Sequence, residues 1–300
     1  MDELNEYLRS KYPVNYWTGE KDCNLLIWGA NREPSMCTIN IGIEYNPYDE
    51  EANKKEIIDI LTHKYKTDYA FTRLIRYGKY ISDKSAVPFG LIIYPSLRQK
   101  YQDRWEESEK EYDREKVRFY WSDLANSTVF DLSGKQLKDL LYNKMGAIYT
   151  DAGTTKDENS HLADYFHFWS RETLSKNITK LDIDAMILSD NSENGILIEI
   201  KRSSKPPIPK WVPHKNDKAN YILELEYAKK INALFWLLHH ESRPCNNNDI
   251  ISFYDIKGIN SDKTSDYLMT SETVLECVVS GDNSLCSRIE EYLRENRNNK

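Results

Sequence analysis

Two short apolar stretches in the second half of the chain constrain its fold most strongly. They are LDIDAMILS (181–189) and GILIEIKRS (195–203), and a polar segment that begins DNSE joins them. Alternating apolar residues with many β-branched side chains indicate strands, whereas Asp, Asn, Ser and Gly indicate a turn. The sequence therefore predicts a β-hairpin at this point.

The predicted hairpin carries acidic and basic side chains on one face. Side chains alternate along a strand, so Asp182 and Asp184 share a face of the first strand. Glu199 and Lys201 likewise share a face of the second. If the turn pairs residue 188 with residue 195, Asp184 lies opposite Glu199, and Asp182 lies opposite Lys201.

Such a register brings two carboxylates close together. Directly opposite residues have Cβ atoms about 4.5–5.5 Å apart, so these carboxylates repel unless a positive charge lies between them. Mg²⁺ prefers oxygen ligands and typically takes one or two carboxylates. We therefore expect Asp184 and Glu199 to bind a metal, with Asp184 favoured over Asp182 because it lies deeper in the strand; Asp182 is a candidate second ligand.

Lys201 completes the pattern. Its ammonium group can orient or help to deprotonate an attacking water, or stabilise charge on a phosphate during transfer. The alternative is a solvated hairpin face with salt bridges, because exposed ion pairs are common and individually weak.

These residues resemble the PD-(D/E)XK nuclease superfamily, which includes most type II restriction endonucleases, over roughly residues 155–257. The resemblance implies an α/β fold with a mixed central sheet flanked by helices. It also implies catalytic roles for Asp184, Glu199 and Lys201, Mg²⁺ as cofactor with Mn²⁺ as a substitute, and the Ile200 carbonyl as a further metal ligand. The superfamily's Pro-Asp at the first acid is Ile-Asp in this chain.

Helices and a strand that suit the resemblance flank the hairpin. Residues 159–174 have apolar positions at helical spacing, as do residues 219–232, and ALFWLL (233–238) follows as a buried strand. Some members of the superfamily take another acid from the upstream helix. Asp164 and Glu172 are the candidates for that role, although a polar residue on an amphipathic helix usually faces solvent.

A second acid-x-lysine sequence, Asp255-Ile-Lys257, lies near the end of the apolar stretch IISFYDIKG. The strand predicted before it, residues 233–238, carries no acid that could share a metal. We therefore interpret this sequence as an ordinary strand exit.

A basic, proline-rich segment, RSSKPPIPKWVPHKNDK, follows Lys201 directly. Its four prolines exclude a helix and favour a stiff, extended loop. Such a loop suits a nucleic-acid backbone, and a tryptophan within it can stack on a base. The candidate nucleic-acid-binding residues are Arg202, Lys205, Lys210, Trp211 and Lys215. The alternative is a solvated surface loop whose tryptophan packs on the core.

Composition limits the class of protein only loosely. The chain has 300 residues and a net charge of −7, which is not typical of a nucleic-acid-binding protein, although an acidic total can contain a basic cleft. Its five cysteines form no C-x-x-C pair, so neither a disulfide framework nor a zinc module is indicated. No apolar run reaches the length of a membrane span, and we expect a cytoplasmic protein.

The first half predicts a mixed α and β region. Strands are expected at 24–29, 37–45, 87–95 and 117–121, and helices at 50–66 and 97–116. Ser133 and Gln136 are expected to form a capping box for a further helix that Gly146 ends. The linker-like stretch 151–160 suggests two domains: 1–150 for recognition, sensing or dimerisation, and 151–300 for the nuclease.

Two classes of function follow. The first is an endonuclease that cuts DNA, either a restriction enzyme or a signal-activated defence effector acting on DNA or RNA. The second is a non-catalytic nucleic-acid-binding protein that retains a nuclease-like fold. Cutting both strands of a duplex usually needs two active sites, so the endonuclease reading also predicts a homodimer.

Overall fold

The computed structural model divides the chain into two compact units. One contains Met1–Gly19 and Ile183–Lys300, and the other contains Glu20–Asp182. The structure describes residues 8–10, 12, 15–19, 23–43, 50–61, 68–96, 117–124, 128–149, 165–189, 194–202, 212–241, 250–270 and 275–278. The boundary expected at residue 150 differs from this division, because it falls inside the second of these units.

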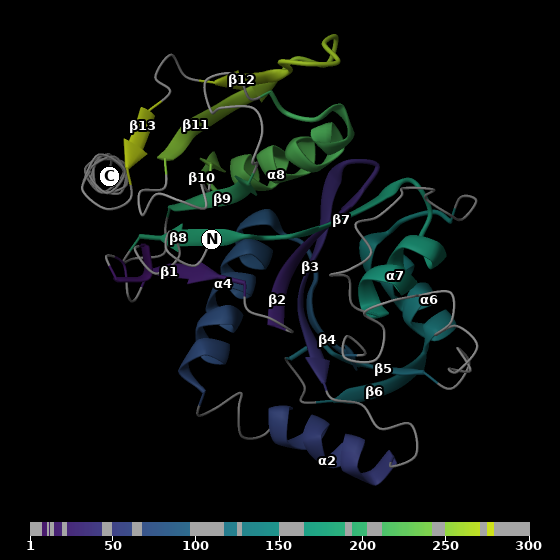
Figure 1. The fold of residues 1–300 in the computed structure, drawn as a ribbon. Helices are drawn as coiled ribbons and strands as arrows, with labels where there is room; N and C mark the ends of the chain where they lie inside the picture. Colours follow the sequence, from purple (N-terminus) through teal and green to yellow (C-terminus); the bar gives the residue numbers. More distant parts are fainter. Residues whose placement is uncertain are drawn as a thin grey trace. The chain divides into compact units, whose positions relative to one another are not determined.

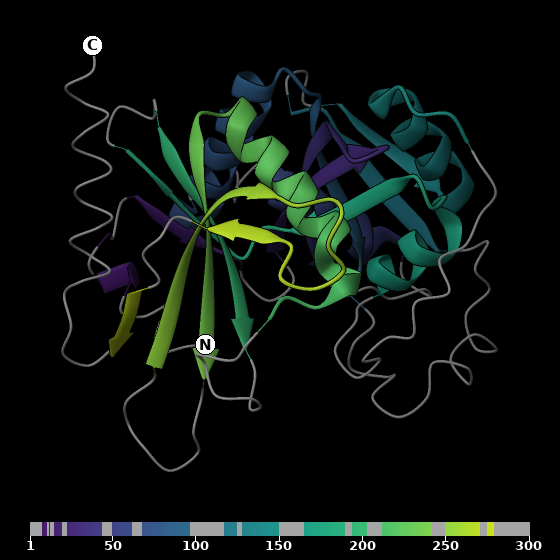
Figure 2. The ribbon, with the colours of Figure 1, turned by 90° about the horizontal axis from the view of Figure 1, so that it is seen from above.

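The unit that contains the C-terminal half is built on a mixed sheet. Its strand order is β1-β8-β9-β10-β11-β12, with β13 paired to β11. The strands are β1 (Tyr16–Thr18), β8 (Ala185–Leu188), β9 (Gly195–Arg202), β10 (Ala233–Glu241), β11 (Ile250–Ile259), β12 (Leu268–Thr270) and β13 (Leu275–Val278). Strands β9 and β10 are parallel, whereas β8–β9 and β10–β11 are antiparallel. Figure 2 shows these strands fanning about one another, as a twisted sheet does.

The predicted hairpin register is present, because Leu188 pairs with Gly195. However, the prediction of one continuous strand over 181–189 is wrong. Ile178–Asp182 forms β7, which pairs with β2 in the other unit, and β8 begins only at Ala185. The two halves pair with strands that are distant in sequence, and nothing in the local alternation of side chains marks the break.

Helix α8 (Lys218–Lys230) covers one face of this sheet, following the short 3₁₀ helix η4 (Lys215–Asp217) (Figure 1). It matches the helix predicted at 219–232, and β10 matches the strand predicted after it. The Tyr221 ring packs 6.3 Å from the Phe235 ring of β10. The opposite face of the sheet carries an apolar cluster that includes Leu8, Ile198 and Trp236.

The other unit contains a six-stranded sheet in the order β6-β5-β4-β3-β2-β7. The strands are β2 (Cys23–Ala30), β3 (Glu33–Ile43), β4 (Phe89–Pro95), β5 (Arg118–Ser122), β6 (Val129–Ser133) and β7 (Ile178–Asp182). Only β3 and β4 are parallel among these pairs. Both sheets are therefore mixed, and the predicted mixed α/β fold class is confirmed.

Helix α4 (Tyr69–Ser85) covers one face of this second sheet, and helices α6 (Gly134–Met145) and α7 (Tyr165–Thr173) cover the other. Helix α2 (Glu50–Asp59) precedes α4 in the chain. Phe166 and Trp169 of α7 pack in one core cluster with Trp28 and residues of α6 (Figure 1). Helix α4 packs on the opposite face, where a Cβ on Gly78 would lie 2.4 Å from the Phe89 ring. The close approach of α4 to the sheet therefore needs a glycine at this position.

The prediction for this unit is correct in its strands and incomplete in its helices. Each strand expected between residues 24 and 121 is present, and the helix expected at 50–66 begins as predicted with α2 at Glu50. Its end lies outside the described residues, which stop at residue 61 in this segment. Helix α4 was not predicted, although Phe71, Leu74 and Ile81 lie buried on it. The helix expected at 97–116 lies outside the described residues, as does the first part of the one expected at 159–174.

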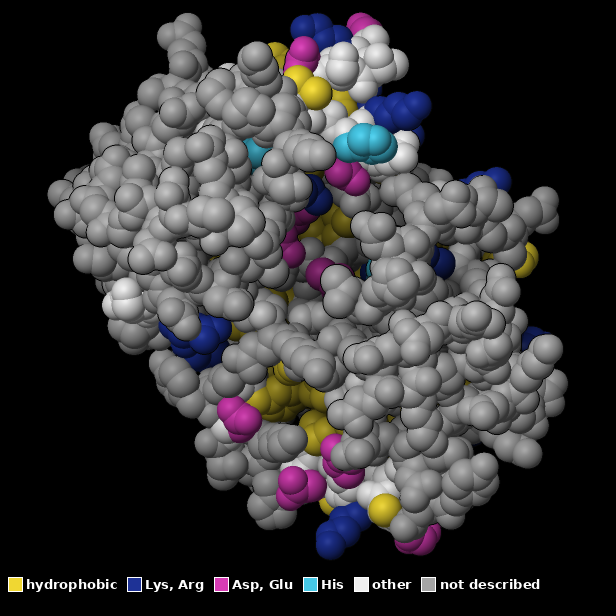
Figure 3. Space-filling view, viewed as in Figure 1, with side chains coloured by type: hydrophobic (Ala, Val, Ile, Leu, Met, Phe, Trp, Pro, Cys, Tyr) yellow, Lys and Arg dark blue, Asp and Glu magenta, His cyan; other side chains and the backbone are white. Residues whose placement is uncertain are grey.

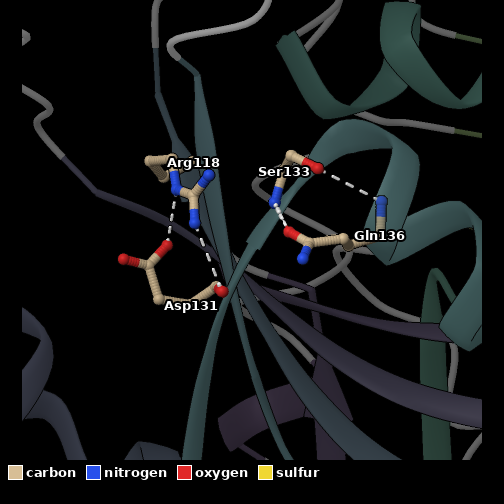
Figure 4. Close-up of polar contacts among 4 residues, drawn as sticks. All are labelled: Arg118, Asp131, Ser133 and Gln136. Carbon is tan, nitrogen blue, oxygen red and sulfur yellow. Dashed lines mark hydrogen bonds and ion pairs between the residues drawn. The ribbon is translucent and has the colours of Figure 1, made fainter.

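The predicted capping box is confirmed at the start of α6. The Gln136 N–H donates to the Ser133 hydroxyl at 3.3 Å, and the Ser133 N–H donates to the Gln136 side chain at 2.8 Å (Figure 4). Gly146 ends the helix with a φ of 61°. Nearby, Arg118 of β5 donates to the Asp131 carboxylate of β6 at 2.7 Å. These local contacts fix one end of the second sheet.

Candidate active site

Asp184 lies between β7 and β8 and is held by two neighbouring strands. Its backbone carbonyl accepts hydrogen bonds from the Thr18 hydroxyl at 2.9 Å and from the Gly19 N–H at 3.2 Å. Its carboxylate oxygen Oδ2 accepts a hydrogen bond from the Ile200 N–H at 2.7 Å. The acidic side chain is therefore fixed beside β9.

The hairpin register places Asp184 next to Glu199. The β8–β9 ladder ends with Ala185 paired to Ile198, so the next two residues in this register are Asp184 and Glu199. Glu199 is buried. Burial, followed by the charge of Glu199, raises the pKa of Asp184 well above its ordinary value. Two carboxylates are thus held close together in a poorly solvated place.

Lys201 forms an ion pair within the same strand. Its Nζ lies 2.5 Å from Oε1 of Glu199. Burial lowers the pKa of Lys201, but the charges of Glu199, Asp217 and Glu224 more than offset this effect, so the net pKa is raised. The ammonium also lies 5.6 Å from the centre of the Tyr221 ring. Lys201 is consequently a fixed cation rather than a ready base.

Helix α8 brings a third acid, Glu224, which the sequence interpretation did not include. Glu224 is 3% exposed. Burial and then the charge of Glu199 raise its pKa well above the ordinary value, and Asp184 also contributes. A signal was available, because Tyr221, Glu224 and Ala228 follow helical spacing on a buried face, and a carboxylate in such a stripe is unusual.

The start of α8 is anchored to the turn between β11 and β12. Lys218 donates from Nζ to the backbone carbonyls of Ser261 at 2.7 Å and Lys263 at 2.9 Å. The Tyr267 hydroxyl donates to the His214 carbonyl at 2.8 Å. These bonds fix the end of the helix that carries Tyr221 and Glu224.

The donor set suits a hard divalent cation. Carboxylate oxygens are typical ligands of Mg²⁺ and Mn²⁺. Oε2 of Glu224 is buried and has no hydrogen-bond partner in the described part of the chain, as a group awaiting a ligand would be. The described residues contain no group of three or more His, Cys, Asp and Glu side chains already spaced as a metal site. The acids have the chemistry of ligands for such a cation, and their side chains would have to move to enclose it.

The structure does not place the remaining candidates at this site. Asp182 is exposed at the end of β7 and pairs there with Leu26, so its predicted place opposite Lys201 is wrong. Lys215 is exposed in η4. The other candidates lie, in whole or in their side chains, outside the described residues: Asp164, Glu172, Arg202, Lys205, Lys210 and Trp211. The Ile200 carbonyl stays a prediction.

On the face that Figure 3 shows, the described side chains at one edge are mixed in charge. In the space-filling view, basic, acidic and histidine side chains adjoin one another at the upper edge, where Figure 1 places β12 and the turn from β11 (Figure 3). None of the described helices has the length and apolar character needed to cross a membrane.

Comparisons with known proteins found no relatives. A scan against protein-family models, a search of curated proteins and a search of solved structures each gave no match.

Proposed function

We propose that this protein is a metal-dependent endonuclease that hydrolyses phosphodiester bonds in DNA, with a restriction-endonuclease-like catalytic unit. The observation that carries the proposal is the arrangement of three side chains, one just before β8 and two on β9. Asp184 accepts the Ile200 N–H, while Glu199 and Lys201 flank that same residue on β9. The pattern read from the sequence is thus supported by a hydrogen bond between its two halves.

The roles of the residues follow from their charges. Asp184 and Glu199 would hold Mg²⁺, which supplies Lewis-acid polarisation of the scissile phosphate when bound. The raised pKa of Lys201 keeps its ammonium charged, so it suits stabilisation of the phosphate's developing negative charge better than removal of a proton from water. In hydrolysis a bond forms between the water oxygen and phosphorus, and the bond from phosphorus to the leaving oxygen breaks. The attacking water loses a proton to solvent, and the leaving oxygen takes up a proton from solvent.

The substrate and assembly follow from the same proposal. The basic segment after Lys201 would contact the nucleic-acid backbone, through Arg202, Lys205, Lys210, Trp211 and Lys215. Cleavage of both DNA strands would be achieved by a homodimer with two such sites. A cytoplasmic restriction or defence role suits these features.

A supercoiled-plasmid assay tests the proposal. Purified protein is incubated with plasmid and Mg²⁺ or Mn²⁺, and a matched reaction contains EDTA. We expect nicked or linear DNA only with the metal. Discrete fragments would support a restriction enzyme, and a smear would support a nonspecific effector. Intact plasmid together with intact single-stranded RNA, with either metal, would contradict the nuclease proposal.

A further inference from the structure

Two buried oxygen atoms on α8 have no hydrogen-bond partner in the described part of the chain. They are the Tyr221 hydroxyl and Oε2 of Glu224. Both residues are almost completely buried, so water does not freely solvate these atoms. Unsatisfied buried polar groups are costly and therefore rare in folded proteins. These two lie within three residues of each other on the helix that covers the sheet.

Both oxygens belong to the same site as the β9 residues. Residues three apart on a helix lie on one face, so Tyr221 and Glu224 point toward the same surface. The charge of Glu199 raises the pKa of both side chains. The Tyr221 ring also lies beside the Lys201 ammonium, 5.6 Å from ring centre to Nζ. The unpartnered oxygens therefore adjoin Glu199 and Lys201 rather than a separate cavity.

Carboxylates outnumber ammonium groups at this place. Asp184, Glu199 and Glu224 lie beside the Lys201 ammonium, and the charge of Asp217 also acts on it. Without a cation, burial and the charge of Glu199 favour the protonated forms of Asp184 and Glu224. A divalent cation would favour their ionised forms, and carboxylate oxygens are the donors that such a cation prefers.

We propose that Glu224 is a ligand of the divalent cation, so that the metal site combines two carboxylates from the sheet with a third from α8. The Tyr221 hydroxyl, one turn earlier, donates a hydrogen bond to a water or phosphate oxygen beside the cation. The inference rests on the proposed metal site of the nuclease, and it adds a ligand that the acid and Glu-x-Lys pattern does not contain.

A structural role for Glu224 and a ligand role predict different results. If Glu224 is a metal ligand, its carboxylate lies beside other carboxylates and destabilises the protein when no cation is present, because like charges repel in a poorly solvated place. Its neutralisation should then stabilise the metal-free protein and weaken metal binding. A purely structural Glu224 would do the reverse: its replacement would lower stability and leave the metal affinity unchanged.

The experiment measures Mn²⁺ binding to the full-length chain by electron paramagnetic resonance, without nucleic acid. Glu224→Gln keeps the size of the side chain and removes its charge. We expect the Kd for Mn²⁺ to rise about tenfold or more, and the melting temperature in EDTA to rise. Glu226→Gln is the matched control, because Glu226 lies on the same helix and pairs instead with Lys229 at 2.7 Å. It should leave the Kd unchanged within about twofold.

A second variant protects the test against a folding failure. Glu224→Asp keeps the carboxylate but shortens it, and we expect a Kd between those of the wild type and Glu224→Gln. If every folded Glu224 variant binds Mn²⁺ as the wild type does, the inference is overturned. The same conclusion follows if the wild type binds no Mn²⁺.

Failure of this inference can be distinguished from failure of the proposed function. Mn²⁺ binding that depends on Glu224, in a protein that cuts no nucleic acid, would support the metal site and contradict the nuclease. If the protein cleaves nucleic acid with a metal but the Glu224 variants bind Mn²⁺ with the wild-type Kd, the nuclease proposal is supported and the ligand role of Glu224 is overturned.

Discussion

Two strands of the same sheet carry nearly the same three-residue sequence in different surroundings. Glu199-Ile-Lys201 lies on β9, and Asp255-Ile-Lys257 lies on β11. Each forms an ion pair within its own strand, with distances from Nζ to the carboxylate oxygen of 2.5 Å and 2.6 Å. The acid-x-lysine sequence therefore determines the local ion pair and does not by itself determine a site.

The two sequences face opposite sides of the sheet. Directly paired residues share a face, and Glu199 pairs with Leu237, on the side that α8 covers. Asp255 pairs with Trp236, which belongs to the apolar cluster on the other side. Only the β9 sequence therefore lies beneath the buried acid of α8.

Solvent exposure separates the two sequences as well. The Lys201 side chain is 27% exposed, whereas that of Lys257 is 49% exposed. Glu199 has two further carboxylates beside it, those of Asp184 and Glu224. The comparison teaches that chemistry depends on what the neighbouring elements bring to an acid-x-lysine sequence.

Removal of each lysine gives the largest expected contrast. Lys201→Ala should lower the rate of DNA cleavage by about 10²–10³-fold, because it removes a fixed positive charge beside the reacting phosphate. Lys257→Ala should change the rate by less than about twofold, since exposed surface charges contribute little. Initial rates of plasmid nicking measure both, and equal losses in the two variants would refute the distinction.

A substitution at Tyr221 tests whether α8 contributes a hydroxyl group to the site on β9. Tyr221→Phe keeps the ring that packs against Phe235 and removes only the hydroxyl. We expect about a tenfold loss in cleavage rate, the effect of one lost hydrogen bond near the reacting group. The melting temperature should not fall, because the hydroxyl has no hydrogen-bond partner among the described residues. An unchanged rate would contradict the proposed hydrogen bond from the Tyr221 hydroxyl.

The raised pKa of Asp184 predicts that the stability of the protein depends on pH. The folded-state pKa of Asp184 is raised above the ordinary value of 3.8, so the native protein binds more protons than the unfolded chain as pH rises past that value. The free energy of unfolding therefore falls with increasing pH, by about 1.4 kcal/mol for each tenfold difference in proton affinity between the two states.

Asp184→Asn should remove this pH dependence. In EDTA the variant should match the wild type near pH 4 and become more stable than it as pH rises toward 8, because asparagine can still accept the Ile200 N–H. Urea unfolding at several pH values measures the difference. A variant that is less stable than the wild type at every pH would show that the Asp184 carboxylate stabilises the fold.

The smallest effect is expected at the β11 ion pair. Lys257→Ala should lower the free energy of unfolding by less than about 1 kcal/mol, because one partner is half exposed and solvent screens the pair. Urea unfolding with high and low salt measures this contribution. A loss of several kcal/mol would mean that the β11 pair stabilises the sheet strongly.

Part of the candidate site could be predicted from sequence, since it depends on local rules. The turn composition and the alternation of side chains determined the pairing of Leu188 with Gly195, and this pairing brings Asp184 to Glu199. The helix after the hairpin was predicted for the same reason, because its apolar spacing is local. The capping box at Ser133 and Gln136 likewise involves neighbouring residues only.

The rest depends on contacts between distant segments. Asp182 continues the alternation of its strand, yet it pairs with Leu26, about 150 positions away, and this partner removes it from the β9 sheet. Glu224 lies at helical spacing with apolar residues, but that spacing does not show that α8 packs on β9 and β10. The periodicity of one strand or one helix does not specify which face of the helix packs on which face of the sheet. The sequence interpretation therefore did not include Glu224.

The most direct test of the central claim compares the two acids under identical conditions. Glu199→Gln and Asp255→Asn are assayed on supercoiled plasmid with Mg²⁺, beside the wild type and an EDTA control. We expect Glu199→Gln to abolish metal-dependent cleavage while keeping a cooperative thermal transition, and Asp255→Asn to cut at the wild-type rate. Cleavage that survives in Glu199→Gln, or is lost equally in both variants, would contradict the central claim.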